Sequence, residues 1–240
     1  MIAPPQPAIK GVLFDVDGTL YHQTPVRAAM AAELGFLAAR RPVEGRRVIA
    51  ALRSFRRHRE ELRDRGHASD RLADMQFRAV AERLGEPSAF VERVVEEWMF
   101  VRPLKYVKAA RRAEAIRLVR TLEARRIRLG VLSDYPALDK LEALGLKGSF
   151  EFALCTTDPD INAFKPHPRG FAYAASLFGL ASEEVVYVGD RPEVDAAGAD
   201  AAGMRCYLVG GAPRRWRDTG KDIDHGSCNL DDLRRICQAA

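Results

Sequence analysis

The sequence predicts an α/β fold: a doubly wound, Rossmann-like parallel sheet core with a second, smaller all-helical cap domain. Three observations lead to this prediction. Short apolar runs alternate with amphipathic helical segments from about residue 109 onward, which is typical of a parallel sheet covered on both faces. An apolar run near the start, residues 8–16, ends in acidic residues and is typical of a buried strand. Between these regions, residues 24–108 are rich in Ala, Leu, Arg and Glu.

The middle segment carries four apolar stripes at helical spacing. They run over residues 30–38, 49–62, 77–84 and 90–98, with breaks at Gly66 and at Glu86-Pro87. We therefore expect an α-helical cap domain of residues 23–108, inserted into a core domain made of residues 1–22 and 109–240. The hinges between the two are expected near residues 21–25 and 103–108.

The remainder of the chain supplies the other elements of the predicted sheet. Strands are expected at residues 128–132, 152–155, 185–188 and 205–209, and helices at 109–124, 136–144, 168–177, 193–202 and 230–237. In open sheets of this kind, functional sites lie at the carboxyl ends of the strands.

Composition is that of a folded protein, with 47% hydrophobic and 30% charged residues in a chain of 240. No stretch approaches the roughly 20 apolar residues that span a bilayer, and the first residues lack an apolar signal-peptide segment, so a cytoplasmic location is expected. The four cysteines form neither a close pair nor a cluster with histidine, which argues against a zinc site or a disulfide framework.

The net charge of +5 is unevenly distributed. Residues 22–108 contain 18 Arg or Lys against 12 Asp or Glu, whereas the rest of the chain contains 20 against 21. Solvated helix faces are the simplest explanation, and a surface that attracts small anionic substrates is the alternative. Nucleic acid is an unlikely partner, because the basic residues are not interleaved with aromatic ones.

Polar side chains gather where the predicted strands end. Asp15 and Asp17 follow the first strand, Ser133 and Asp134 the second, Lys165 lies in the loop after the third, and Asp190 follows the fourth. A doubly wound sheet would bring all of them to one edge. A lone Asp17-Gly18 pair would indicate only a turn, and Ser133 alone only a helix cap.

These residues resemble the four signature motifs of the haloacid dehalogenase-like superfamily, in the family's order. The matching runs are Phe14-Asp15-Val16-Asp17-Gly18-Thr19, then Leu132-Ser133-Asp134, then Lys165, and finally Gly189-Asp190-Arg191-Pro192-Glu193-Val194-Asp195. The position of the helical segment, between the first two motifs, resembles the phosphatase branch with an α-helical first-position cap.

The resemblance implies a catalytic group of four residues. Asp15 would be the nucleophile, Asp17 the acid that protonates the leaving group and then activates water, and Ser133 and Lys165 would bind the phosphate. It also implies Mg²⁺, a hard cation that prefers oxygen ligands. Its ligands would be the side chains of Asp15 and Asp190, the backbone carbonyl of Asp17, and Asp195 through water, although Asp195 could instead be a helix-terminal charge.

The remaining phosphate-binding positions follow from the same resemblance. Gly18, Thr19 and Asp134 join Asp15, Ser133 and Lys165, with backbone N–H groups near Gly18 and Asp134 completing the phosphate cradle. The loop of residues 210–216 could border this site, but an exposed arginine-rich loop is the favoured interpretation.

The expected function is hydrolysis of a small phosphorylated metabolite through a covalent aspartyl-phosphate. Asp17 favours phosphate chemistry, because dehalogenases that resemble this chain lack that second acid. A phosphomutase remains an alternative, followed by a non-catalytic or nucleic-acid-end-binding protein of the same fold. Basic cap residues in the region 53–63 are expected to hold an anionic leaving group. Neither the substrate nor the oligomeric state follows from the sequence.

Overall fold

The computed structural model describes residues 8–66 and 70–209. The expected helix at residues 230–237 and the loop at 210–216 lie outside the described residues, as do Cys228 and Cys237. Within the described ranges, no helix is both long and apolar enough to cross a bilayer.

A parallel sheet forms the centre of the core. It consists of β1 (Gly11–Phe14), β2 (Arg128–Ser133), β3 (Phe152–Cys155), β4 (Val185–Gly189) and β5 (Arg205–Leu208). The strand order is β3-β2-β1-β4-β5 and every pairing is parallel. The predicted α/β fold class is thereby confirmed.

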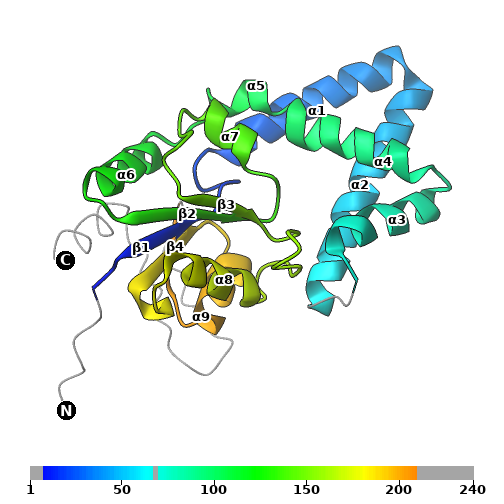
Figure 1. Ribbon diagram of the computed structural model, residues 1–240. Helices are drawn as coiled ribbons and strands as arrows, with labels where there is room; N and C mark the ends of the chain where they lie inside the picture. Colours follow the sequence, from blue (N-terminus) through cyan, green and yellow to red (C-terminus); the bar gives the residue numbers. More distant parts are fainter. Residues whose placement is uncertain (1–7, 67–69, 210–240) are drawn as a thin grey trace.

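Helices cover both faces of this sheet (Figure 1). On one face lie α6 (Ala113–Ala124) and α7 (Leu138–Ala143), and on the other α8 (Arg169–Phe178) and α9 (Ala197–Ala201). Successive side chains of a strand point to opposite faces, so Val12 and Phe14 join one hydrophobic cluster and Leu13 joins the other. The buried strands are apolar on both faces for this reason.

The segment between β1 and α6 is helical, as predicted, and extends away from one edge of the core (Figure 1). It contains α1 (Gln23–Arg40), α2 (Pro42–Arg65), α3 (Leu72–Leu84), α4 (Ser88–Val95), a π-helical turn η1 (Glu96–Val101) and α5 (Leu104–Val107). Pro42 suits the first turn of α2, and α3 ends at Gly85 in the left-handed conformation. We call this helical segment the cap.

Two expected helices differ from the structure. The helix expected at 109–124 begins at Ala113, because the residues just before it pair with the chain that leaves β1: His22 N–H donates to Ala110 O and Arg112 N–H to Leu20 O. The helix expected at 193–202 is split into a π-helical turn, η3 (Pro192–Ala196), and α9. A 3₁₀ turn, η2 (Ser182–Glu184), precedes β4.

The chain therefore enters and leaves the cap side by side. Tyr21 forms isolated bridges to Asp17 and to Arg111, which ties both connections to the loop that follows β1. The domain boundaries at residues 22/23 and 108/109 stay a prediction, as do the hinge positions.

Candidate active site

The sheet places Asp15 at its topological switch point. β1 is the central strand and pairs with β2 on one side and with β4 on the other. The chain continues from β1 to β2 and β3 on the first side and then returns past β1 to β4 and β5 on the second. Ligands of doubly wound folds bind in the crevice at such a point, outside the carboxyl ends of the strands. Asp15 directly follows β1, its N–H donates to Val188 O at 2.8 Å, and it is only 5% exposed. Asp190 directly follows the neighbouring β4.

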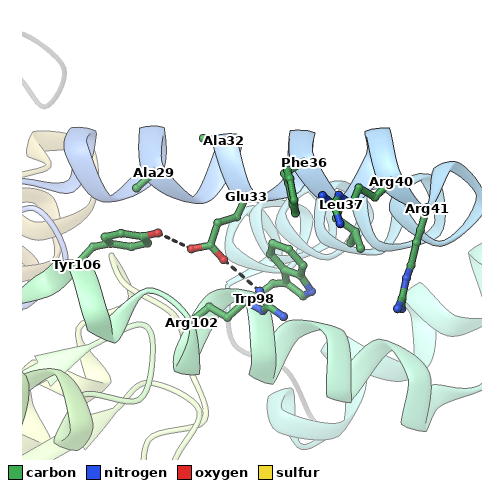
Figure 2. A pocket seen from close by; sticks show the side chains of 10 residues that line it. All are labelled: Ala29, Ala32, Glu33, Phe36, Leu37, Arg40, Arg41, Trp98, Arg102 and Tyr106. Atoms are coloured by element: carbon green, nitrogen blue, oxygen red, sulfur yellow. Dashed lines mark hydrogen bonds and ion pairs between the residues drawn. The ribbon is translucent and has the colours of Figure 1, made fainter.

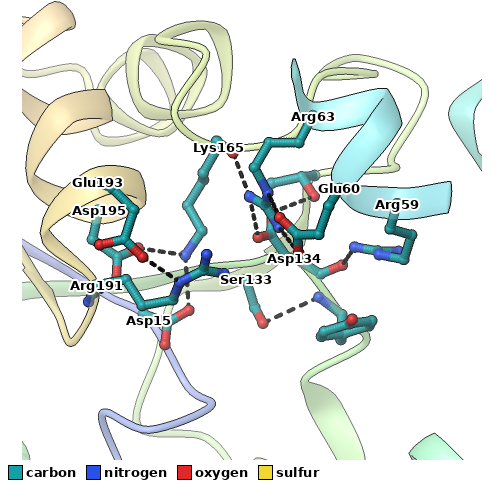
Figure 3. Close-up of polar contacts among 12 residues, drawn as sticks. Asp15, Arg59, Glu60, Arg63, Ser133, Asp134, Lys165, Arg191, Glu193 and Asp195 are labelled. Carbon is teal, nitrogen blue, oxygen red and sulfur yellow. Dashed lines mark hydrogen bonds and ion pairs between the residues drawn. The ribbon is translucent and has the colours of Figure 1, made fainter. Parts of the chain in front are cut away.

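Lys165 links the carboxylates of this crevice. Its Nζ lies 2.8 Å from Asp15 Oδ1, 2.7 Å from Asp195 Oδ1 and 2.8 Å from the Tyr187 hydroxyl. Figure 3 shows the ammonium group pointing between the two carboxylates. Lys165 is 3% exposed, and the buried carboxylates around it hold its pKa well above the usual lysine value against the opposing effect of burial. The cation therefore stays charged.

Asp195 fixes the loop that follows β4. Its Oδ2 accepts hydrogen bonds from the backbone N–H groups of Asp190 and Arg191, both at 3.0 Å, while Oδ1 accepts from Lys165. The side chain is buried within the crevice rather than exposed at a helix end. Both of its oxygens are thus engaged in orienting their neighbours.

The cluster of Asp15, Asp190 and Asp195 has the composition of a site for a hard cation. One carboxylate oxygen from each residue lies within 4.8 Å of the others. Two oxygens bound to one octahedral Mg²⁺ lie about 3 to 4 Å apart, so small movements of Asp15 and Asp190 would suffice. The donor set fits the ion.

Two of these acids, Asp15 and Asp190, have raised pKa values, and burial is the largest cause for both. Burial raises the pKa of Asp15 to about 8; the charges of Asp195, Asp190 and Asp17 add to the effect and Lys165 opposes it. Burial, with the charge of Asp195 next, raises the pKa of Asp190 to about 6. A cation bound between the carboxylates would relieve this repulsion.

The turn after β1 brings its backbone close to Asp190. Gly18 has φ of +97°, and a Cβ there would stand 2.0 Å from Asp190 Oδ2. Only glycine adopts this conformation without strain and also leaves room for the Asp190 carboxylate. The next residue, Thr19, donates its hydroxyl to Asp15 Oδ2 at 3.2 Å. The turn therefore packs directly against the acidic cluster.

Asp17 is held by two side chains that do not belong to the acidic cluster. Lys140 Nζ, from α7, lies 2.8 Å from Asp17 Oδ1 and 2.6 Å from Oδ2. The Tyr21 hydroxyl also donates to Asp17 Oδ1. The carboxylate is more than the polar tip of a turn, since it is largely buried and has three polar contacts.

Ser133 and Asp134 end β2 on the other side of β1. Ser133 Oγ accepts from the Tyr135 N–H at 3.3 Å, and α7 has Ala137 at its N-cap, so Ser133 does not cap that helix. Asp134 Oδ1 accepts from the Thr156 hydroxyl at 3.0 Å. One oxygen of the Asp134 carboxylate is therefore bound to a side chain of the core.

The cap reaches this part of the core through two arginines of α2 (Figure 3). Arg63 Nη1 donates to Asp134 Oδ2 at 3.0 Å and to the backbone carbonyl of Lys165. Arg59 Nη2 donates to the Asp134 carbonyl at 2.5 Å, and its guanidinium stacks 4.2 Å from the Tyr135 ring centroid. Although burial acts in the opposite direction, the cations Lys165, Arg63 and Arg59 lower the pKa of Asp134 to about 2.

The chain as a whole matches a known family. Residues 9–203 match the haloacid dehalogenase-like hydrolases. The chain belongs to this family. The family assignment made from the four motifs is confirmed.

Individual relatives carry more specific names. This haloacid dehalogenase-like hydrolase is 32% identical to the phosphoglycolate phosphatase of Cereibacter sphaeroides over 216 residues, 82% of the chain and 84% of the relative. It is 29% identical to the glyceraldehyde 3-phosphate phosphatase of Methanopyrus kandleri over 201 residues, 82% of either chain. A solved structure, the 2-haloacid dehalogenase of Pseudomonas syringae, aligns with a TM-score of 0.64 and 25% identity, over 96% of the chain and 99% of that structure.

The hydrolase fold brings several predicted site residues together. Lys165 contacts Asp15 and Asp195, Asp190 lies in the same cluster, and Gly18 and Thr19 pack against it. Asp17 turns toward Lys140 and Tyr21, and the Asp134 side chain turns toward the cap arginines.

Sequence reasoning missed Tyr187 and Lys140, and it placed Arg63 only in the basic region 53–63, without its contact to Asp134. Tyr187 lies within β4. Its hydroxyl accepts a hydrogen bond from Lys165 Nζ and donates one to Leu132 O at 3.0 Å, which fixes the position of the Lys165 ammonium group. A tyrosine within the otherwise apolar run Val-Val-Tyr-Val was a signal, because a buried tyrosine hydroxyl requires a partner. Lys140 and Arg63 gave no such signal among the many charged residues of their helices.

A cavity of about 700 Å³ lies elsewhere in this hydrolase, between α1 and η1 of the cap (Figure 2). Its lining includes Phe36, Trp98 and Tyr106 together with Arg102, whose guanidinium pairs with Glu33. None of the predicted site residues lines it. This cavity is therefore separate from the acidic cluster.

Proposed function

We propose that this hydrolase is a Mg²⁺-dependent phosphatase that cleaves a small phosphorylated metabolite through a covalent phosphoryl group on Asp15. The supporting observation is the close grouping of Asp15, Lys165 and the acids Asp190 and Asp195 at the switch point of the sheet. Two buried carboxylates and a half-buried one beside a single lysine suit a metal and a phosphate better than a neutral substrate. We also propose residues 23–108 as the cap domain and residues 1–22 and 109–240 as the core.

Asp15 has the contacts that a nucleophile requires. Lys165 binds Oδ1 and Thr19 binds Oδ2, which together fix the carboxylate plane at the end of β1. In the first step, a carboxylate oxygen of Asp15 attacks phosphorus and the bond to the leaving-group oxygen breaks. Lys165 would neutralise part of the charge on the phosphoryl oxygens, because its own charge is retained in the crevice.

Asp17 would move the protons in both steps. It gives a proton to the leaving-group oxygen as the ester bond breaks. In the second step it takes a proton from water, whose oxygen attacks phosphorus and releases phosphate from Asp15. This second carboxylate, two residues after the nucleophile, favours phosphate esters over carbon–halogen bonds.

Magnesium would be held by the side chains of Asp15 and Asp190 and by the backbone carbonyl of Asp17. When bound, Mg²⁺ supplies charge neutralisation that allows an anionic substrate to approach carboxylates. Asp195 would contribute from outside the direct ligands, since its two oxygens already accept three hydrogen bonds.

The phosphate group would be bound by the turn after β1 and by the end of β2. The Ser133 hydroxyl is available to donate, because its oxygen accepts a bond from Tyr135 N–H without using the hydroxyl hydrogen. Backbone N–H groups near Gly18 and Asp134 would complete the cradle, with Thr19 orienting Asp15.

The proposed substrate is small because the cap docks on the crevice. Relatives named for phosphoglycolate and glyceraldehyde 3-phosphate support this class of metabolite. The proposal that basic residues of 53–63 hold the leaving group now rests on exposed Arg53, Arg56 and Arg57, since Arg59 and Arg63 are engaged with the core. A cytoplasmic location stays a prediction.

The direct test is hydrolysis of p-nitrophenyl phosphate and of a panel of phosphorylated metabolites, with Mg²⁺ and with EDTA. We expect phosphate release that requires Mg²⁺ and that is lost in Asp15→Asn. A protein that only moves phosphate between positions of a sugar phosphate would indicate the phosphomutase alternative. Absence of activity on every phosphate ester, in a folded protein loaded with Mg²⁺, would refute the proposal.

A further inference from the structure

We propose that Lys140 is a positioning residue for Asp17: together with Tyr21 it holds the carboxylate in the orientation needed to pass a proton to the leaving group. The inference rests on the proposed phosphatase function. It adds a residue from outside the four signature motifs to the machinery of the reaction.

The contact between Lys140 and Asp17 is close and largely shielded from solvent. Nζ lies within 2.8 Å of both carboxylate oxygens. The exposed fraction is 5% for the lysine side chain and 12% for that of the aspartate. A lysine is rarely buried unless it is paired, and this one is paired with a single carboxylate through two hydrogen bonds. The carboxylate is thereby fixed in rotation as well as in position.

The support of Lys140 is rigid. It lies on α7, and Leu141 of this helix and Leu144, just after its end, belong to the hydrophobic cluster between helix and sheet. Its aliphatic stem is therefore confined by packing, and the ammonium group has little freedom to leave Asp17. The ring of Tyr135, which follows Ser133 and Asp134, lies 5.6 Å from Nζ.

Tyr21 contacts the same carboxylate from another direction. Its hydroxyl donates to Asp17 Oδ1, and its backbone bridges Asp17 and Arg111 where the two cap connections run side by side. One oxygen of Asp17 thus has two donors and the other has one. Oδ2, with one donor among the described residues, is the oxygen that would carry the proton for the leaving group.

Stability alone does not account for this pair. Replacing a buried ion pair by apolar residues of similar volume is often neutral or stabilising, because both charges lose their hydration. A pair that is retained beside a reaction centre is better explained by the geometry it imposes. Proton transfer needs such geometry, since a misplacement of about 1 Å can reduce a rate about 100-fold.

The leaving group provides a readout that a purely structural role would not affect. An alkoxide requires a proton as it departs, whereas p-nitrophenolate is a stable anion and departs without one. Loss of the Lys140 contact should therefore harm an alkyl phosphate and spare p-nitrophenyl phosphate. The value of kcat/KM is suitable because it covers the steps up to transfer of the phosphoryl group to Asp15.

The test compares Lys140→Met with the wild-type enzyme on these two substrates. Methionine keeps the apolar stem and removes the charge. We expect kcat/KM for the alkyl phosphate to fall about 10- to 100-fold, and that for p-nitrophenyl phosphate to fall less than about 3-fold. Lys147→Met is the matched control, since Lys147 is exposed and pairs only with Glu142 among the contacts that the described residues make. Equal losses on both substrates would overturn the inference.

A double-mutant cycle shows whether Lys140 acts through Asp17. In the Asp17→Asn background, Lys140→Met should cause no further loss of kcat/KM for the alkyl phosphate, because the carboxylate it orients is already gone. A further loss as large as in the wild type would contradict the inference. Lys140→Arg keeps the charge and should recover most of the kcat/KM for the alkyl phosphate; it also serves if Lys140→Met does not fold. An Arg variant that loses activity by more than about 3-fold, and equally on both esters, would also count against the inference.

Different results would refute the positioning role of Lys140 and the phosphatase function on which it rests. If the wild type hydrolyses both esters and Asp17→Asn is impaired while Lys140→Met resembles the wild type, the inference fails and the phosphatase function stands. If the folded, Mg²⁺-loaded wild type hydrolyses neither ester, both fail.

Discussion

Lys165 Nζ lies 2.8 Å from Asp15 Oδ1, although the two residues are 150 positions apart in the chain. The same ammonium group is 2.7 Å from Asp195 Oδ1 and is fixed by the Tyr187 hydroxyl on β4. A single buried cation therefore sets the relative positions of the proposed nucleophile and of the loop that carries Asp190.

Replacing Asp15 by Asn should abolish turnover and leave the fold intact. The amide has the same shape but cannot attack phosphorus to form an acyl phosphate. We expect kcat for p-nitrophenyl phosphate to fall by at least about 1,000-fold, as is common when a covalent nucleophile is removed. Circular dichroism and the melting temperature check the fold. A variant that keeps substantial activity would exclude the covalent route through Asp15.

Stabilisation by Mg²⁺ should increase with pH. The pKa of Asp15 is raised to about 8 and that of Asp190 to about 6, so both bind protons more tightly in the folded chain than in the unfolded one. These two groups therefore make the metal-free protein less stable as pH rises from about 4 to 8. Mg²⁺ binds the charged forms, so it competes with protons.

The measurement is the shift in melting temperature caused by Mg²⁺ at about pH 5.5 and about pH 8.5, with a larger shift expected at the higher pH. Asp190→Asn is the control and should lose most of the shift at both values. A shift that is independent of pH, or that survives Asp190→Asn, would mean that the ion binds elsewhere.

Gly18→Ala should harm the acidic cluster in addition to straining the backbone at residue 18. Gly179 also has positive φ, but a Cβ there would meet nothing within 4 Å. Gly179→Ala should therefore cost only about 1 kcal/mol of unfolding free energy from the left-handed conformation. Gly18→Ala adds a contact of 2.0 Å with Asp190 Oδ2, which must move.

We expect Gly18→Ala to weaken Mg²⁺ binding and to lower kcat by at least about 10-fold, because the cluster is displaced. Urea unfolding and the Mg²⁺ dependence of the rate are the measurements. Similar behaviour of the two alanine variants would show that space beside Asp190 is unimportant.

Arg63→Met should loosen the cap from the core. It removes the 3.0 Å contact with Asp134 Oδ2 and leaves that buried carboxylate without its cap partner. Breaking such a pair costs about 3 kcal/mol. The pKa of Asp134 is lowered to about 2 from an ordinary value of 3.8, so the paired carboxylate contributes stability above pH 3.8 that is lost toward pH 2.

The loss of unfolding free energy in Arg63→Met should accordingly be full near neutral pH and become smaller in acid. If docking of the cap supports substrate binding, KM should also rise. Arg56→Met, an exposed position on the same helix, is the control for stability. If both variants melt alike at neutral pH, Arg63 does not secure the cap.

Much of the fold was accessible from the sequence because its signals are local. Hydrophobic runs of strand length, the helical stripes between residues 30 and 98, and the break at Glu86-Pro87 depend on neighbouring residues only. Boundaries were less accessible. Helix α6 begins at Ala113 because the preceding residues pair with residues 20–22, through contacts that span 88 and 92 positions.

The sequence by itself determined the family, the parallel sheet with its helical cap, and a group of site candidates that includes Asp15, Asp17, Lys165 and Asp190. It could do so because residues at the carboxyl ends of parallel strands must converge on one edge. Only the tertiary structure decided which charges meet: Lys165 with Asp195 and Tyr187, Lys140 with Asp17, and Arg63 with Asp134. Long charged side chains look alike along a helix, and burial against a distant partner is what distinguishes them.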